Sequence, residues 1–211
     1  ILLEDSDKTC FVEVKNVTLD MGGGLALFPD SVTSIGQEVF SGLSNLTSIV
    51  IGNLVTSMWH FNGYSNLTSA TIGNSVTSIP DSAFDGISSL TSVTIGNSVT
   101  SIGNDAFRNT GLTSVTIPDS VTSIGNEAFN GCSSLTSVVI PDSVTYIDGY
   151  AFRNTGLTSV TIMVSEEDGD YPDFSTAFDS NTWEAVTFSP VEFEVTIPDV
   201  GLRTLLENKL G

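Results

Sequence analysis

Small apolar residues recur along the middle of the chain, separated by serine, threonine and glycine. The stretch Leu90–Ile95 shows the pattern well. Val93 and Ile95 are two residues apart, so in an extended strand they share one face, while Ser92 and Thr94 share the other. The pattern therefore predicts a short strand with one buried and one exposed face.

A second extended piece follows each predicted strand after a turn. The turn is Gly96-Asn97 in one unit and Pro118-Asp119 in another, and both pairs suit turn conformations. The second strand is expected over Val99–Ile102, and Gly103–Phe107 is expected to form a single helical turn.

The whole unit is repeated at intervals of 21 to 23 residues. A leucine, a valine and a phenylalanine keep their places in each copy. The leucines are Leu46, Leu67, Leu90, Leu112, Leu135 and Leu157; the valines are Val32, Val55, Val76, Val99, Val121 and Val144; the phenylalanines are Phe40, Phe61, Phe84, Phe107, Phe129 and Phe152. A fixed period of this length predicts a solenoid, because one unit cannot bury its own apolar face and stacked units can.

The repeated sequence LTSVTIPDSVTSIGNEAFNGCSSL begins at Leu112. It resembles the BspA-like class of leucine-rich repeats, of the Treponema pallidum type with units of about 22–23 residues. The resemblance extends from Phe28 to Ile162. It implies a leucine-rich-repeat solenoid of about seven coils, mostly β with short helical turns. It also implies a non-catalytic role in protein–protein interaction or adhesion, in a protein that is secreted or on the cell surface, with an organelle lumen as the alternative.

The two ends of the chain depart from the repeat. We expect residues 1–27 to form an N-terminal β cap, residues 28–162 the regular repeats, residues 163–190 an acidic insertion followed by a seventh coil, and residues 191–211 a C-terminal strand and amphipathic helix. Phe178 and Val186 resume the rhythm of the repeat, with Trp183 in the leucine position. The terminal helix is expected to cap the last coil or to dock on another protein.

The charge narrows the classes of partner. Six basic and 25 acidic residues give a formal net charge of −19, which argues against binding to nucleic acid or to an anionic membrane. It favours solubility and either cations or a basic partner. No apolar run reaches the length of a membrane span. The sequence shows no charged-then-apolar leader, which is also what a mature form with its leader removed would show.

Two cysteines are too few for a disulfide framework. Cys132 stands where sister repeats have Leu43, Tyr64 and Ile87, so it is expected to be a small core residue without a bond to the distant Cys10. Three glycosylation sequons begin at Asn16, Asn45 and Asn66; they suit a secretory route but also arise readily by chance in a chain so rich in Ser and Thr.

Catalytic chemistry is not expected. The single histidine has no partner arrangement, and no serine lies in a nucleophile elbow. No phosphate loop or zinc spacing occurs. The acidic insertion Glu166–Asp173 offers several oxygen ligands, so Ca²⁺ is a weak possibility there; otherwise we expect no metal and no cofactor.

Partner contacts are expected at irregular positions rather than on the regular coils. The second full coil is two residues shorter and carries Trp59, His60 and Tyr64 close together. Tryptophan and tyrosine are enriched among residues that dominate binding. The other reading is that larger side chains refill the core of a shortened repeat. Trp183 and the helix residues Leu202 and Leu206 complete the predicted contact set.

Rows of small hydroxyls are expected on the outer faces. One row is Ser48, Ser69, Ser92, Ser114, Ser137 and Ser159; the next is Val50, Thr71, Thr94, Thr116, Val139 and Thr161; the third is Thr33, Thr56, Thr77, Thr100, Thr122 and Thr145. Such rows suit a soluble strand surface. An alternative function is ice binding through Thr71, Thr94, Thr116 and Thr161, and a further alternative is a structural subunit of a larger assembly.

Overall fold

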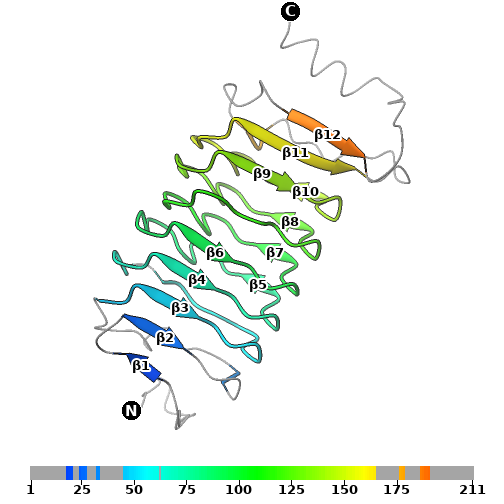
Figure 1. Ribbon diagram of the computed structural model, residues 1–211. Coiled ribbons are helices and arrows are strands. Elements are labelled where there is room, and N and C mark those ends of the chain that lie inside the picture. The colour runs from blue at the N-terminus through cyan, green and yellow to red at the C-terminus, as the bar shows by residue number, and fades with distance from the viewer. Residues whose placement is uncertain are drawn as a thin grey trace, which may run out of the picture.

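The chain folds as an elongated solenoid in which successive repeats stack as coils (Figure 1). The computed structural model describes residues 18–20, 24–27, 32–33, 45–61, 63–164, 176–178 and 186–190. Among these, the repeats run in order from β2 to β12, and no helix is formed. The predicted leucine-rich-repeat solenoid is thus confirmed.

Short strands with one buried face build the first side of the stack. A five-stranded sheet has the order β1-β2-β3-β4-β6, with bounds Thr18–Asp20, Leu25–Leu27, Ser48–Val50, Ser69–Thr71 and Ser92–Thr94. The β1 and β2 strands are antiparallel, and every later pair is parallel. Further along the same side, β9 (Ser137–Ile140), β11 (Ser159–Val164) and β12 (Val186–Pro190) form a three-stranded parallel sheet.

A second, parallel sheet lines another side of the stack. Its order is β10-β8-β7-β5, with bounds Tyr146–Ile147, Ser123–Ile124, Ser101–Ile102 and Ser78–Ile79. The register places each isoleucine on the isoleucine of the next coil, for example Ile79 on Ile102. This arrangement follows from the constant offset of Ile from Val in each repeat.

The first side is interrupted at one coil. Segment 114–117 forms no strand, and in the described structure no backbone hydrogen bond joins it to either neighbouring coil. The interruption coincides with the change of turn from Gly96 to Pro118. A Cβ on Gly96 would lie 2.4 Å from the carbonyl oxygen of Gly73, so the glycine turns are stacked too closely for a proline ring. We attribute the missing backbone hydrogen bonds of segment 114–117 to the proline ring of Pro118.

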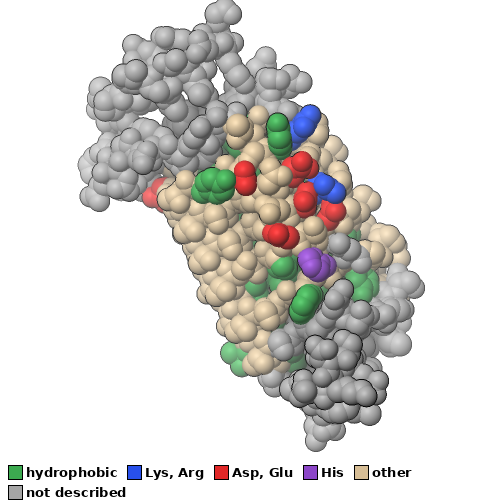
Figure 2. Space-filling model, turned by 180° about the vertical axis from the view of Figure 1, so that it is seen from behind, with side chains coloured by type: hydrophobic (Ala, Val, Ile, Leu, Met, Phe, Trp, Pro, Cys, Tyr) green, Lys and Arg blue, Asp and Glu red, His purple; other side chains and the backbone are tan. Residues whose placement is uncertain are grey.

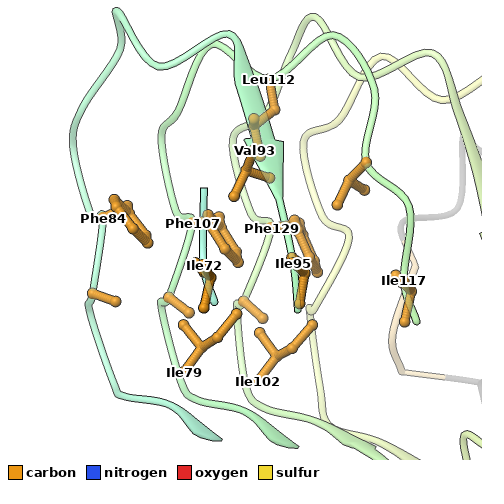
Figure 3. Close-up of a cluster of buried hydrophobic side chains, with 14 of the residues drawn as sticks. Ile72, Ile79, Phe84, Val93, Ile95, Ile102, Phe107, Leu112, Ile117 and Phe129 are labelled. Carbon is orange, nitrogen blue, oxygen red and sulfur yellow. The ribbon is translucent and has the colours of Figure 1, made fainter. Parts of the chain in front are cut away.

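The core is a column of apolar side chains, each lying on its counterpart in the next coil (Figure 3). Its most regular part is a ladder of phenylalanines. Phe61, Phe84, Phe107, Phe129, Phe152 and Phe178 stack in sequence with ring centroids 5.0 to 5.3 Å apart and interplanar angles of 5° to 14°. The predicted valine, leucine and phenylalanine rows are buried wherever they are described. Phe178 and β12 also continue the coil pattern, as the spacing predicts.

Two polar side chains buried in the column, Cys132 and Thr110, are hydrogen-bonded. Cys132 is buried, as expected for a small core residue, and its thiol donates to the carbonyl oxygen of Phe107 at 3.1 Å. The hydroxyl of Thr110, which is also buried, donates to the same oxygen at 2.9 Å. Burial raises the pKa of the Cys132 thiol. This thiol is therefore a packing group and not a nucleophile.

The segments before each phenylalanine differ from the expected helical turn. Residues 104–109 form a run of turns, with Asp105 and Asn109 both at φ 54°. Left-handed positions recur in the other coils, at Gly63, Ser82, Gly86, Glu127, Gly131, Tyr150 and Asn154. A left-handed residue reverses the chain at once, so each coil passes the phenylalanine in tight turns rather than in a helix.

The remaining predictions for the ends fall outside the described residues. They are the strand at 11–14, the acidic insertion at 166–173, the strand at 191–197 and the helix at 200–210. Cys10 also lies outside them.

Candidate interaction surface

The charged and aromatic side chains gather along one edge of the solenoid. This phenylalanine edge comprises the segments 58–61, 80–87, 103–110, 125–132 and 148–155, each of which contains one ladder phenylalanine. Figure 2 shows red and blue side chains in a strip on this face, with the single histidine beside them. Both described arginines, Arg108 and Arg153, belong to the edge.

Backbone hydrogen bonds between coils hold the edge in register. The phenylalanine N–H of each coil donates to the alanine carbonyl of the next, for example Phe84 to Ala106 at 2.8 Å and Phe107 to Ala128 at 2.7 Å. The left-handed residues also donate across coils, as Asn109 does to Asn130 at 2.8 Å. Regular backbone hydrogen bonds thus join the coils along the edge, and the side chains of the edge project from fixed positions.

Arg108 is surrounded by three carboxylates from three coils. It donates to both oxygens of Asp85, from Nε at 3.0 Å and from Nη2 at 3.3 Å. Its Nη1 lies 3.0 Å from Oδ1 of Asp105 and 3.7 Å from Oε2 of Glu127. Asn130 donates to the same Glu127 oxygen at 2.8 Å. The bidentate pair links adjacent coils, and the cluster keeps a net negative charge.

The electrostatics of this cluster are set by its partial burial. Desolvation is the main reason that the pKa of Asp105 is raised above its ordinary value of 3.8; Arg108 opposes the rise, and Glu127 and Asp85 add to it. The pKa of Arg108 is raised chiefly by its hydrogen bond to Asp85. The arginine therefore stays charged and is committed to neighbours within the molecule.

The irregular second coil contributes two of the predicted contact residues. Trp59 is 47% exposed, and its ring meets that of His60 edge-on at a centroid distance of 6.5 Å. His60 is half-buried, and its Nδ1 is buried without a hydrogen bond. Tyr64 instead packs against the core. The structure thus brings Trp59 and His60 together at the surface, while Tyr64 fits the reading in which a larger side chain refills the core.

The other predicted contact residues, Trp183, Leu202 and Leu206, lie outside the described residues, as does the calcium possibility at 166–173. In the part of the chain that the structure describes, no group of three His, Cys, Asp or Glu side chains could hold a metal ion. No helix in that part is long and apolar enough to cross a membrane.

The serine and threonine rows point outward, as predicted. None of Thr71, Thr94, Thr116 and Thr161 is buried. The backbone beneath this row is broken at Thr116, within the unpaired segment 114–117. On the second side, threonine hydroxyls donate to the threonine carbonyl of the preceding coil, as Thr100 does to Thr77 at 3.0 Å and Thr122 to Thr100 at 3.1 Å. These hydroxyls therefore help to join the coils.

Sequence analysis did not single out the sixth coil, which contains Tyr146, Tyr150 and Phe152. Tyr146 and Tyr150 are 55% and 48% exposed, and the guanidinium carbon of Arg153 lies 5.0 Å from the centroid of the Tyr150 ring. The signal was available, because sister repeats have Ser123 and Glu127 where this coil has the two tyrosines. Aligning the repeats also places Arg108 one coil from Asp85.

Comparison with protein families identifies the repeats. The model of the BspA type leucine rich repeat region matches residues 57–171, with six copies. The chain belongs to the BspA-type leucine-rich repeat family. The resemblance drawn from the repeated words is thereby confirmed, although the match begins later than Phe28. Residues 1–57 match a different model, the sugar fermentation stimulation protein RE domain, which sequence analysis missed.

Several solved structures share the fold. A leucine-rich repeat protein from Bacteroides ovatus is 28% identical with a TM-score of 0.63, over 81% of this chain and 43% of that one. One from Eubacterium ventriosum is 30% identical with a TM-score of 0.55, over 66% and 39%. The Treponema pallidum leucine-rich repeat protein, 23% identical with a TM-score of 0.52 over 88% and 83%, is similar in fold. The chain thus spans less than half of the first two proteins.

The curated relatives match a short stretch only. A sugar fermentation stimulation protein homolog of Thioalkalivibrio sulfidiphilus is 50% identical over 38 residues, which are 18% of this chain and 16% of that protein. The homolog of Geotalea daltonii is 58% identical over 38 residues, with the same shares. The chain therefore covers about a sixth of the length of these relatives.

Proposed function

We propose that this BspA-type protein is a non-catalytic scaffold that binds another protein through its phenylalanine edge. The observation that carries the proposal is the segregation of side chains. Exposed Trp59, half-buried His60 and both described arginines occupy this edge, whereas the outward rows of the sheets are mostly small hydroxyls, interrupted by Val139 and Tyr146. Aromatic and arginine side chains dominate the binding energy of protein interfaces.

The hydroxyl-rich faces have a structural role in this proposal. Ser69 donates to Ser48 at 2.8 Å, Ser101 to Ser78 at 2.9 Å, and the threonines bond to neighbouring carbonyls. Hydroxyls engaged between coils favour a stabilising role over a catalytic one. From the family, we further propose that the protein acts in adhesion and lies outside the cell or on its surface. Fractionation of source cells, with the protein followed by antibody, tests the location.

The binding role is tested by measuring affinity for a captured partner. Biotinylated protein is used to capture partners from a source extract, and each candidate is purified and titrated against wild type and two variants. Trp59→Ala on the edge is expected to weaken binding about tenfold or more. Thr94→Ala, on the first sheet, is the matched control and is expected to leave the affinity unchanged.

The result that would overturn the proposal is the reverse pattern, in which Thr94→Ala weakens binding and edge variants do not. The native mass of the protein in a gentle extract addresses the assembly alternative. A particle far above 22.2 kDa, in which the neighbouring subunits do not contact the phenylalanine edge, favours the structural-subunit alternative. A monomer that inhibits ice recrystallisation, and loses this activity on Thr94→Ala, favours ice binding.

A further inference from the structure

The sixth coil carries two tyrosines where the third, fourth and fifth coils have smaller or more polar side chains. On the second sheet, Tyr146 continues the outward row Ser78, Ser101 and Ser123. On the phenylalanine edge, Tyr150 continues the left-handed row Ser82, Asp105 and Glu127. Both departures fall within five residues, so one coil presents two aromatic rings side by side in sequence.

Packing within the solenoid does not account for these rings. Tyr146 is 55% exposed and Tyr150 is 48% exposed, so neither belongs to the core. Tyr150 also sits at φ 60°, where a side chain other than glycine costs about 1–2 kcal/mol. Because Ser82, Asp105 and Glu127 share the left-handed position, it is the exposure of the two rings that points to a role outside the fold.

Neighbouring groups lie close to both rings. The guanidinium of Arg153 lies over the Tyr150 ring at 5.0 Å, a cation–π contact. The charge of Asp148 is the main reason that the pKa of Tyr146 is raised, and Oδ1 of Asp148 accepts from the Gly149 N–H at 2.7 Å. Side chains that are ordered before binding lose less entropy when a partner arrives.

The surroundings determine the chemistry of the partner. Asp148 lies between the two tyrosines in sequence, and Arg153 covers the Tyr150 ring. Glu127, Asp105 and Asp85 belong to the same edge, and Arg108 is already committed to these three carboxylates. The whole chain has a net charge of −19. A positive segment gains from this field, and lysine or arginine side chains can also stack on an exposed ring.

We propose that Tyr146, Asp148 and Tyr150 form a contact site for a lysine- and arginine-rich segment of a partner protein. The proposal rests on the protein-binding function above and locates it on the sixth coil. Tyr146 supplies an exposed ring, Tyr150 supplies apolar area beside Arg153, and the carboxylates select positive charge. Net charge alone would attract basic peptides to many places, so the test must depend on the uncharged rings.

The test uses a synthetic twelve-residue peptide of alternating Lys/Arg and Gly/Ser, and a control peptide with Glu at the basic positions. Binding to the full chain is measured by fluorescence anisotropy. The variant Tyr146→Ser/Tyr150→Ser introduces the residues of sister coils, Ser123 and Ser82, and leaves the charge unchanged. Its melting curve checks the fold. We expect it to bind the basic peptide about tenfold more weakly than wild type.

The matched control is Val139→Thr, which replaces an exposed apolar side chain on the first side of the solenoid with the residue of sister coils and is expected to bind the basic peptide as wild type does. Unchanged affinity of the double tyrosine variant, or equal binding of the acidic peptide, would overturn the proposal. The two proposals can fail separately. A purified partner whose binding depends on Trp59 but not on the tyrosines supports the binding function and refutes the sixth-coil site.

Discussion

Asp105 combines a left-handed backbone with a partly buried carboxyl group. Its backbone is left-handed, at φ 54°, and its side chain is partly buried beside Arg108, Glu127 and Asp85. Desolvation outweighs the attraction of Arg108, so the folded state favours the protonated carboxyl. The stability that this group contributes is therefore complete below pH 3.8 and is lost as the pH rises through the higher pKa of the folded state.

We expect Asp105→Asn to raise the free energy of unfolding at pH 7 by up to about 1 kcal/mol. Asparagine tolerates the left-handed conformation and carries no charge to desolvate. The gain should shrink towards pH 3, where Asp105 is protonated in both states. Urea unfolding of variant and wild type at both pH values measures the effect. A gain that grows as the pH falls would contradict the assignment.

At the scale of the secondary structure, segment 114–117 is the weak point of the first side. The coils on each side of it are paired into β6 and β9, but this segment makes no backbone hydrogen bond in the described structure. The second sheet remains continuous across the same coil, through β8.

Amide hydrogen exchange should detect this difference. We expect the amides of residues 114–117 to exchange roughly tenfold or more faster than those of Ser92–Thr94 and Ser137–Ile140, since exchange follows local opening. Peptide-level mass spectrometry, with the second-sheet segment Ser123–Ile124 as an internal control, provides the measurement. Equal protection of all three first-side segments would show that the coils are paired there in solution.

The sequence predicted the coils well and the edge poorly, for a physical reason. Val93, Ile95 and Phe107 are fixed by burial, and burial repeats with the period of the chain. The turn conformation at Gly103–Phe107 was predicted wrongly, because one turn of helix and a run of left-handed turns place Phe107 similarly. Contacts such as Asp85–Arg108 join residues 23 positions apart and emerge only when coils are stacked. The likeness of residues 1–57 to another family leaves no trace in the alternation of apolar residues.

For the whole molecule, the dominant feature is the charge of −19 on a quasi-linear stack. Each coil contacts only its neighbours, so stability is roughly a sum of terms along the axis. Like charges on successive coils, such as Asp119 and Asp142, therefore repel where such coils meet and oppose compaction. The ion pairs of Arg108 act in the opposite sense, but they are local to three coils.

If repulsion dominates, salt should stabilise the solenoid. Raising NaCl from about 0.01 M to about 0.15 M shortens the Debye length from about 30 Å to about 8 Å, which screens coil-to-coil repulsion more than the close Arg108 pairs. We expect a rise of a few degrees in the unfolding midpoint, measured by calorimetry. Chloride is the right anion, because sulfate would strengthen apolar burial by itself. A midpoint that falls with salt would mean that ion pairs such as Arg108–Asp85 outweigh the net charge. Arg108→Gln should then abolish that fall.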